Sequence, residues 1–355
     1  MIKGGQREPF GILTASRSAE IFGGNVANFK RIIKAANKQG ISCSIYNVCP
    51  QGMTVYTGSS TEKLVRTDDR ELPKVLYNRI PTRELENKSY VRDMLNQWEQ
   101  QGHVITNPHF LRKDHLSQIW HSHPELVSYV PESRIVENAT DILQFAEHTS
   151  TFYVKPIAGK AGVGILHVAL QDQHYEVVEQ QKGKRVSYGT LTQRQFEQWV
   201  NHRKWKCRYL LQEEAPVKLY HGRRFDLRLL LHKDSLKKFD ITGMGVRVGS
   251  VSGITTHVPN GGVIAKPQKV LYSVFGSRAK RVEQTARLVA IDAAEAISNF
   301  SKTWTELSID MGLLQDGTPV LFEANAKPMK FDELAIETAA KDRLVQCLLH
   351  LGSDR

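Results

Sequence analysis

Residues Glu306–Pro328 read ELSIDMGLLQDGTPVLFEANAKP, and this stretch decides the fold of the C-terminal part of the chain. Asp316 and Gly317 separate two runs rich in apolar residues, which predicts a β-hairpin with a two-residue turn. Counting outward from that turn places Asp310 directly opposite Glu323. Side chains alternate between the faces of a strand, so one face of the hairpin is predicted to enter the core. Its members are Ile309, Met311, Leu313, Val320, Phe322 and Ala324.

The other face of this hairpin carries Asp310, Glu323 and Asn325. Two carboxylates opposed on a sheet, with Cβ atoms about 5 Å apart, repel each other and weaken the pairing. A bound cation would reverse that cost, and carboxylate and amide oxygens suit Mg²⁺ or Mn²⁺. The alternative is an exposed acidic face without a ligand, because antiparallel sheets often keep one face in water. We predict that these three residues are metal ligands, on the evidence of the rest of the chain.

The composition is that of an ordinary globular protein, with 355 residues, 41% of them hydrophobic and 24% charged. That length allows two or three domains. No apolar run reaches the roughly 18 residues that a membrane-spanning helix needs, and we expect neither a membrane span nor a secretory signal. The four cysteines are scattered without a C-x-x-C pair, which argues against a disulfide framework or a zinc site and fits the reducing cytoplasm.

The net charge of +11 raises the question of nucleic-acid binding. The basic residues are spread through the chain, and the tightest clusters, Lys182–Arg185 and Lys237–Lys238, are short. We therefore expect no nucleic-acid partner, since bound phosphate groups are an equally good use of the excess charge.

The N-terminal part of the chain alternates between strand and helix patterns. Such alternation predicts an α/β domain with a parallel sheet. The predicted strands are Phe10–Ala15, Ile41–Val48, Lys74–Tyr77 and His103–Thr106, and the predicted helices are Asn28–Gln39 and Lys88–Gln101.

A glycine-rich loop joins two strand-like segments within Thr151–Val168 (TFYVKPIAGKAGVGILHV). Lys155 ends the first strand, and the loop contains Gly159, Gly162 and Gly164. Glycines let backbone N–H groups approach phosphate oxygens, and a phosphate would satisfy the charge of Lys155. The loop is neither a P-loop nor a Rossmann turn, because it joins two strands and lacks the sequence of either. An ordinary hairpin with glycines at its tip is the alternative.

Two later strand-like stretches carry arginines among apolar residues. Gly222–Leu231 (GRRFDLRLLL) places Asp226 and Arg228 on one strand face, and Ile241–Val248 (ITGMGVRV) carries Arg247. The planar fork of Arg228 is suited to binding a phosphate through two hydrogen bonds. A surface ion pair between Asp226 and Arg228, worth little, is the alternative.

The remaining stretches fit around such a site. Tyr209–Val217 (YLLQEEAPV) predicts a strand that runs into Gln212, Glu213 and Glu214. Thr255–Gly262 (TTHVPNGG) is a loop of polar residues and glycines, suited to closing over a ligand. Further helices are predicted over Arg278–Asn299 and Asp332–Leu349.

The segments VKPIAGKAGVGI, LLQEEAP, RRFDLRLLL and IDMGLLQDGTPVLFEANAKP occur in the order of an ATP-grasp nucleotide-binding unit. This similarity covers Asn107 to Leu349, and the D…E-x-N of the final hairpin is its most specific part. FGILT, FDLRLLL, ITGMGVRV and THVPNGG further resemble the YheC/YheD family of endospore coat-associated proteins, its YheC members in particular.

The resemblance implies an α/β plus α+β chain. An N-terminal α/β domain over residues 1–106 would precede a two-subdomain ATP-grasp fold, with subdomains over 107–205 and 206–355. ATP and Mg²⁺ or Mn²⁺ are the implied cofactors, bound between the two subdomains.

The same resemblance implies a role for each candidate residue. Lys113 and Lys155 match the lysines that hold the phosphates and the adenine side, and the loop of Gly159, Gly162 and Gly164 matches a flexible phosphate lid. The run Gln212, Glu213, Glu214 and Ala215 matches the hinge that contacts adenine through its backbone, with Glu214 reaching the ribose. Asp310, Glu323 and Asn325 match the metal ligands, and Arg228 and Arg247 match the arginines near the γ-phosphate and the acceptor.

The implied activity is a carboxylate–amine ligase that makes ADP and proceeds through an acylphosphate, with Lys155, Arg228 and Arg247 as catalytic residues. Its expected setting is the mother-cell cytoplasm, in association with the endospore coat and its proteins. A coat-assembly protein that binds ATP without catalysis, and a phosphotransferase, are the alternatives. The acceptor and the amine are not specified by the sequence.

Overall fold

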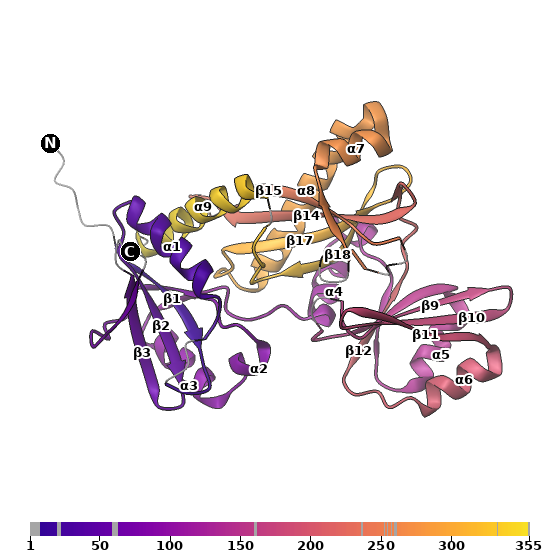
Figure 1. Ribbon diagram of the computed structural model, residues 1–355, viewed down its shortest axis with the longest axis horizontal. Coiled ribbons are helices and arrows are strands. Elements are labelled where there is room, and N and C mark those ends of the chain that lie inside the picture. The colour runs from indigo at the N-terminus through magenta and orange to yellow at the C-terminus, as the bar shows by residue number, and fades with distance from the viewer. Residues whose placement is uncertain are drawn as a thin grey trace.

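The computed structural model describes residues 8–19, 23–58, 63–159, 162–235, 237–251, 253, 255–256, 258, 261–331 and 333–353. Over these residues the chain forms three six-stranded sheets, each with its own helices, in three lobes (Figure 1). None of the helices described is long and apolar enough to cross a bilayer.

The first sheet is built around β1 (Phe10–Ala15), whose residues are all buried. It has the order β4-β3-β2-β1-β5-β6, and its central strands pair in parallel, which confirms the prediction. Two antiparallel strands that were not predicted, β3 and β4, extend one edge. The strands are β2 (Cys43–Cys49), β3 (Gly52–Gly58), β4 (Leu64–Thr67), β5 (Val75–Asn78) and β6 (Val104–Thr106), and the helices are α1 (Val26–Lys38), α2 (Arg83–Glu86) and α3 (Ser89–Gln100).

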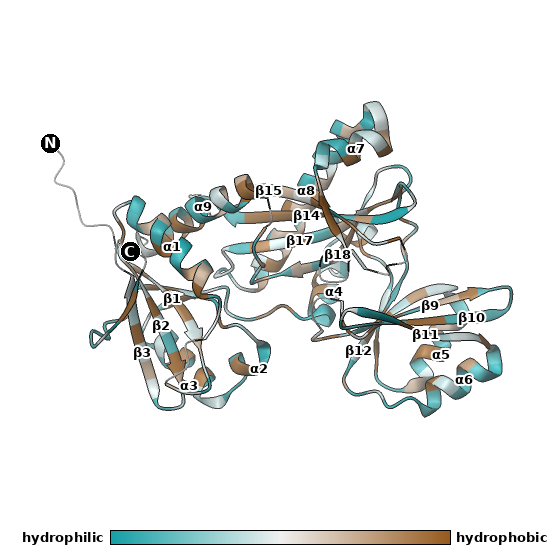
Figure 2. Ribbon diagram, in the orientation of Figure 1, coloured by the Kyte–Doolittle hydropathy of each residue, from teal (hydrophilic) through white to brown (hydrophobic). Residues whose placement is uncertain are grey.

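The second sheet is antiparallel throughout, with the order β11-β10-β9-β8-β12-β7. Two helices cover one face, and each begins with a capping box, at Asn138 and at Thr192. In Figure 2 the helix α6 shows both teal and brown, as expected of an amphipathic helix on a sheet. The elements are β7 (Ser133–Val136), α5 (Ala139–His148), β8 (Thr151–Pro156), β9 (Ile165–Gln171), β10 (His174–Gln181), β11 (Lys184–Thr192), α6 (Gln193–His202) and β12 (Tyr209–Glu213).

The third sheet has the order β16-β15-β14-β17-β18, and the short β13 also pairs with β14. Its strands are β13 (Leu219–Tyr220), β14 (Arg223–Lys233), β15 (Phe239–Val248), β16 (Val263–Ala265), β17 (Glu306–Leu313) and β18 (Pro319–Asn325). Its helices are α4 (Lys113–His121), α7 (Pro267–Phe275), α8 (Ala279–Phe300) and α9 (Leu334–Ser353), with 3₁₀ turns at Val127–Tyr129 and Gly276–Arg278.

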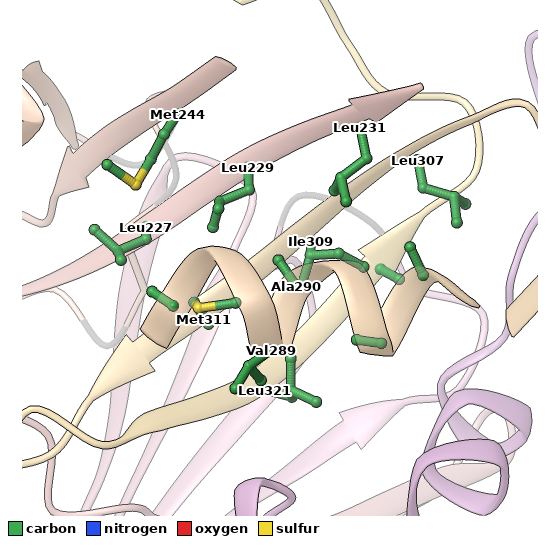
Figure 3. Close-up of a cluster of buried hydrophobic side chains, with 14 of the residues drawn as sticks. Leu227, Leu229, Leu231, Met244, Val289, Ala290, Leu307, Ile309, Met311 and Leu321 are labelled. Carbon is green, nitrogen blue, oxygen red and sulfur yellow. The ribbon is translucent and has the colours of Figure 1, made fainter. Parts of the chain in front are cut away.

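The long helix α8 packs on one face of the third sheet. Figure 3 shows Val289 and Ala290 of α8 against Leu227 and Leu229 of β14 and Ile309 of β17. The side chains of alternate residues on these strands therefore point away from α8, toward the other face. That other face carries Asp226, Arg228, Asp310 and Glu323.

The β17–β18 hairpin has the predicted pairing but also a longer turn and a β-bulge that the sequence did not predict. Asp310 lies opposite Glu323, as predicted. The turn is one residue longer than expected, because Leu314 pairs with Thr318 around it. A β-bulge between Leu321 and Glu323 then restores the register.

The bulge corrects the prediction that Phe322 enters the core. Met311 pairs with Leu321, so Phe322 is the extra residue of the bulge. Leu321 is fully buried in the core, whereas Phe322 lines the cavity on the other face. The local pattern could not show this, because a bulge shifts every side chain beyond it to the opposite face.

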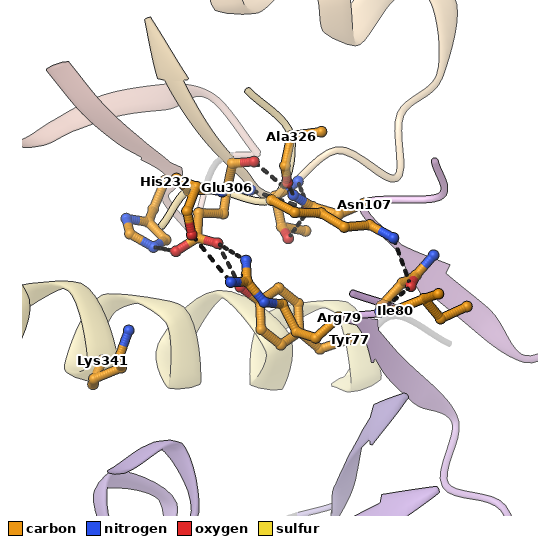
Figure 4. Close-up of polar contacts among 12 residues, drawn as sticks. Tyr77, Arg79, Ile80, Asn107, His232, Glu306, Ala326 and Lys341 are labelled. Carbon is orange, nitrogen blue, oxygen red and sulfur yellow. Dashed lines mark hydrogen bonds and ion pairs between the residues drawn. The ribbon is translucent and has the colours of Figure 1, made fainter. Parts of the chain in front are cut away.

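A buried polar network joins the first sheet to the third (Figure 4). Arg79 binds Glu306 of β17 at 3.5 Å and donates to the Pro328 carbonyl at 3.0 Å. His232 of β14 contacts the other Glu306 oxygen at 3.2 Å. Burial alone would raise the pKa of Glu306, but the hydrogen bond and charge of His232 and the charge of Arg79 lower it to about 2. Glu306 is therefore a charged anchor between the two sheets.

Two helices pack on a sheet that is distant from them in sequence. Trp120 of α4 donates to the Ala293 carbonyl of α8 at 3.2 Å, so α4 packs in the core of the third sheet. The C-terminal helix α9 packs on the third sheet where Ala340 contacts the cluster of Leu230, and it reaches the core of the first sheet through Leu344 and Leu348. The domain boundaries at 106/107 and 205/206 stay predictions.

Candidate nucleotide-binding site

A cavity lies between the second and third sheets, with about 870 Å³ of empty space that is partly open to solvent. Its walls come from β8, β9 and β12 on one side and from β14, β15, β17 and β18 on the other. Nine of the predicted site residues line it: Lys113, Lys155, Gln212, Glu213, Glu214, Ala215, Arg247, Asp310 and Glu323.

Lys155 stands at the end of β8 with its amine turned toward β12. Its Nζ donates a hydrogen bond to the Gln212 side-chain oxygen and lies 5.0 Å from the centre of the Tyr153 ring. Burial, and then the charge of Lys113, lower the pKa of Lys155 to about 7. An anion placed here would restore the charge of this lysine, which is the behaviour expected of a phosphate-binding group.

Glu214 is held in the cavity by three neighbouring side chains. One oxygen accepts from Tyr153 at 2.9 Å and also pairs with Arg224, and the other lies 2.9 Å from His167. Burial would raise the pKa of Glu214, but the His167 hydrogen bond and the Arg224 charge lower it to about 2. Glu214 is therefore a fixed acceptor of hydrogen bonds, as a ligand with hydroxyl groups requires.

The backbone of the predicted hinge is partly used within the second sheet. The amide of Glu213 donates to the Glu132 carbonyl at 2.9 Å, and that of Glu214 donates to the Thr151 carbonyl at 2.9 Å. A donor from the hinge backbone to a ligand therefore has to come from a neighbouring residue. Ala215, which lines the cavity before Pro216, is the neighbour in place.

Arg247 is held in the wall of the third sheet by two aspartates. Its Nε and Nη2 donate to the two oxygens of Asp226, at 3.0 and 2.8 Å, and the same Nη2 lies 2.9 Å from an oxygen of Asp310. Thr256 donates to the same Asp226 at 2.5 Å. The predicted alternative, a surface pair between Asp226 and Arg228, is wrong, because the buried Asp226 pairs across to Arg247 on the neighbouring strand.

The opposed carboxylates are each balanced by basic groups. Glu323 accepts from the Lys113 amine at 2.6 Å. Asp310 lies 3.7 Å from Arg228, whose guanidinium also stands 5.4 Å from the Phe331 ring centre. Arg228 does not line the cavity itself but contacts one of the residues that do.

Besides Arg228, four further predicted residues lie outside the lining of this cavity. Asn325 pairs with Ser308, one row beyond the Asp310–Glu323 pair, so its ligand role stays a prediction. The other three are the glycines of the predicted lid, Gly159, Gly162 and Gly164. The amide of Gly164 already donates to the Gln180 carbonyl at 2.7 Å. Of the predicted closing loop, His257, Pro259 and Asn260 lie outside the described residues.

Comparison with known proteins identifies this arrangement. A family model described as YheC/D-like ATP-grasp matches residues 102–352. The chain belongs to this ATP-grasp family. The resemblance to the YheC/YheD family drawn from the sequence motifs is thereby confirmed, as is the mixed α/β fold class.

Two relatives of this ATP-grasp chain come from Bacillus subtilis (strain 168). The endospore coat-associated protein YheD is 25% identical over 72% of the chain and 57% of its own length. The endospore coat-associated protein YheC is 22% identical over 64% of the chain and 62% of its own length. The chain thus matches less than two thirds of the length of either relative.

Solved structures show the same ATP-grasp fold over nearly the whole chain. D-alanyl-alanine synthetase A from Vibrio cholerae matches with a TM-score of 0.58 at 12% identity, over 98% of this chain and 99% of that one. The D-alanine-D-alanine ligase from Coxiella burnetii matches with a TM-score of 0.53 at 12% identity, over 97% and 95%. At such low identity the likeness concerns the fold.

The ATP-grasp family uses a nucleotide with a divalent metal, and the donors of this cavity suit one. Asp310 and Glu323 are directly opposed and both line the cavity. Across the described residues, His, Cys, Asp and Glu side chains form no group of three that could hold a metal ion. Two carboxylates suit Mg²⁺ that shares its shell with phosphate oxygens and water, and do not suit a site made by protein alone.

Several cavity residues of this family member escaped the sequence reasoning. Tyr153 and His167 lie opposite each other on β8 and β9, and both contact Glu214. Arg224 reaches Glu214 from the third sheet. Tyr153 was within reach of prediction, since it lies two residues before Lys155 and shares its face. The contacts of His167 and Arg224 with Glu214 depend on the strand order of two sheets, which the sequence does not show.

Proposed function

We propose that this protein is an ATP- and Mg²⁺-dependent ligase that joins a carboxylate to an amine through an acylphosphate. The observation that carries the proposal is one cavity that combines Lys113 and Lys155 with the opposed Asp310–Glu323 pair and with Arg247. These groups match the charges of a metal-bound triphosphate, and the ATP-grasp family is the context in which they occur.

The roles of the residues follow from their charges. Lys155 and Lys113 would neutralise phosphate oxygens, while Glu214 and the hinge at Ala215 would receive the nucleoside. Arg247 and Arg228 flank Asp310 and would face the charge that spreads over the transferring phosphoryl group. Mg²⁺, when bound by Asp310 and Glu323, would supply further neutralisation and orient the phosphates. Placing both reactants in line is the main contribution asked of the protein.

The setting of the reaction is proposed from the relatives. Both are named endospore coat-associated proteins, and the four cysteines of this chain are all free, as in a reducing compartment. We infer that the chain acts in the mother-cell cytoplasm on components associated with the coat.

The test is release of ADP with MgATP and panels of carboxylates and amines, with phosphate and the joined product measured in parallel. A ligase yields ADP, phosphate and product. Formation of a phosphorylated acceptor would indicate a phosphotransferase, and nucleotide binding without ADP would indicate a coat-assembly protein. Failure to bind MgATP at all would refute the nucleotide site.

Glu323→Gln and Arg228→Ala test the residues. Removing one group that contacts the transferring charge costs about 3–4 kcal/mol of barrier, so each variant is expected to lose at least about a hundredfold in turnover. Glu283→Gln and Arg287→Ala remove the same charges from an ion pair on α8 and serve as controls. If both site variants turned over at the rate of the parent, the assignment of Glu323 and Arg228 to the site would be wrong.

A further inference from the structure

The face of the third sheet that carries the site can be read as rows across its strands. One row runs through Gly245, Arg228, Asp310 and Glu323, each directly opposite the next. The next row runs through Gly243, Leu230, Ser308 and Asn325. The first row therefore leads from the metal-ligand pair through Arg228 to a glycine on β15.

The two glycines of β15 leave room for another segment to lie directly on the sheet. A Cβ atom on Gly245 would stand 2.5 Å from Glu333 Oε1, and one on Gly243 would stand 2.6 Å from Ile336. Phe331, from the same segment, stacks against Arg228. The carboxylate of Glu333 is thus seated on the strand position next to Arg228, at a place that only glycine permits.

One oxygen of the half-buried Glu333 side chain is shielded from solvent there without compensation. Its Oε1 has almost no contact with solvent and no hydrogen-bond partner among the residues that the structure describes. The Ser308 hydroxyl in the adjacent row is in the same state. A buried acceptor left without a partner costs about 1–3 kcal/mol, so such atoms call for a ligand that donates hydrogen bonds.

A carboxylate oxygen accepts hydrogen bonds and attracts positive charge, so it does not suit a phosphate or the acceptor carboxylate. Cross-strand neighbours have Cβ positions about 5 Å apart, which brings a group bound at Glu333 within reach of one held by Arg228. The missing ligand is thus a cationic or N–H-bearing group beside the place where the acylphosphate would form.

We propose that Glu333 binds the ammonium group of the amine substrate and accepts its proton. The inference rests on the proposed ligase function and adds a catalytic residue to it. The amine enters as an ammonium ion, and one proton passes to the Glu333 carboxylate and then to solvent. The freed nitrogen lone pair forms the C–N bond, the bond from the acyl carbon to the phosphate oxygen breaks, and phosphate leaves with that electron pair and takes up the second proton.

Binding of methylammonium to the protein loaded with MgADP tests the proposal without knowledge of the substrate. Saturation-transfer NMR should detect the methyl signal in the parent, and methanol should serve as a neutral probe that does not bind. Glu333→Gln keeps the size of the side chain and should weaken methylammonium binding at least tenfold. Glu283→Gln, on α8, removes the same charge elsewhere and should leave it unchanged.

Gly245→Ala is a second variant, which keeps the Glu333 charge and displaces its carboxylate. It should also lose methylammonium binding, while MgADP affinity stays at the parent value in both variants. Methylammonium that fails to bind the parent, or that binds Glu333→Gln as tightly as the parent, would overturn the role of Glu333. A parent protein that does not bind MgADP would instead refute the proposed function. Failure of the Glu333 proposal and failure of the proposed function are therefore distinguishable.

Discussion

Single residues of the cavity owe their properties to their surroundings. Lys155 follows an apolar strand and would have an ordinary pKa if it were exposed. Burial and the nearby Lys113 lower that pKa to about 7. The ligand-free site therefore holds a lysine that is largely neutral at pH 8, ready to become charged on a phosphate.

This residue predicts proton uptake on nucleotide binding. Phosphate oxygens favour the charged amine, so MgATP binding at pH 8 should take up protons. Since the free protein loses the proton above pH 7, affinity should fall from pH 7 to pH 9, by at most about tenfold per unit. Calorimetry in two buffers of different ionisation enthalpy measures the uptake. Lys155→Met should abolish it, and equal heats in both buffers for the parent would contradict the prediction.

At the scale of the element, the β17–β18 hairpin shows how a register is set. Its longer turn and its bulge offset each other, so that Asp310 faces Glu323 although Phe322 changes sides. Phe322 then lies over Gly312, where an added Cβ would stand 2.5 Å from the Phe322 ring and 2.7 Å from Val217. The glycine thereby lets an aromatic ring line the cavity beside Glu323.

Gly312→Ala should disturb this packing. Overpacking of this kind costs about 1–3 kcal/mol of unfolding free energy, and displacement of Phe322 should also weaken MgATP binding. Denaturant melts and a nucleotide titration measure the two effects. Gly312→Ala combined with Phe322→Ala removes the collision with the ring but keeps the one with Val217, so it should recover part of the stability without recovering affinity. A single variant as stable as the parent would show that the ring moves freely.

At the scale of the whole molecule, one asparagine connects the first sheet to the third. Asn107 follows β6 with a φ of 52°, in the left-handed region that asparagine tolerates. Its amide nitrogen donates to the carbonyls of Glu306, at 2.6 Å, and of Ala326, while its oxygen accepts from Thr305 at 3.0 Å. These contacts, drawn in Figure 4, hold both strands of the hairpin against the chain that leads to Lys113.

Asn107→Asp should therefore destabilise the protein strongly at almost unchanged volume. The new carboxylate would face two carbonyl oxygens without a proton to donate, which costs about 3 kcal/mol or more when buried. Asn25→Asp is the matched control, because Asn25 caps α1 by accepting from Asn28 and aspartate caps equally well. Unfolding in urea compares the two. Equal midpoints for the two variants would show that Asn107 does not hold the first sheet to the third.

The sequence by itself determined those features that depend on neighbours along the chain. Alternating apolar residues placed Asp310 and Glu323 on one face, strand–helix alternation predicted the parallel first sheet, and Lys155 was found at a strand end beside glycines. Side-chain direction repeats every two residues in a strand, so such features follow from local order alone.

The tertiary structure decided which distant groups meet. It placed Arg224 and His167 on Glu214, exchanged Arg228 for Arg247 as the partner of Asp226, and laid Glu333 on Gly245. These contacts depend on strand order, on bulges and on the path of segments far apart in the chain. Since one inserted residue reverses the face of every side chain beyond it, local patterns do not fix them.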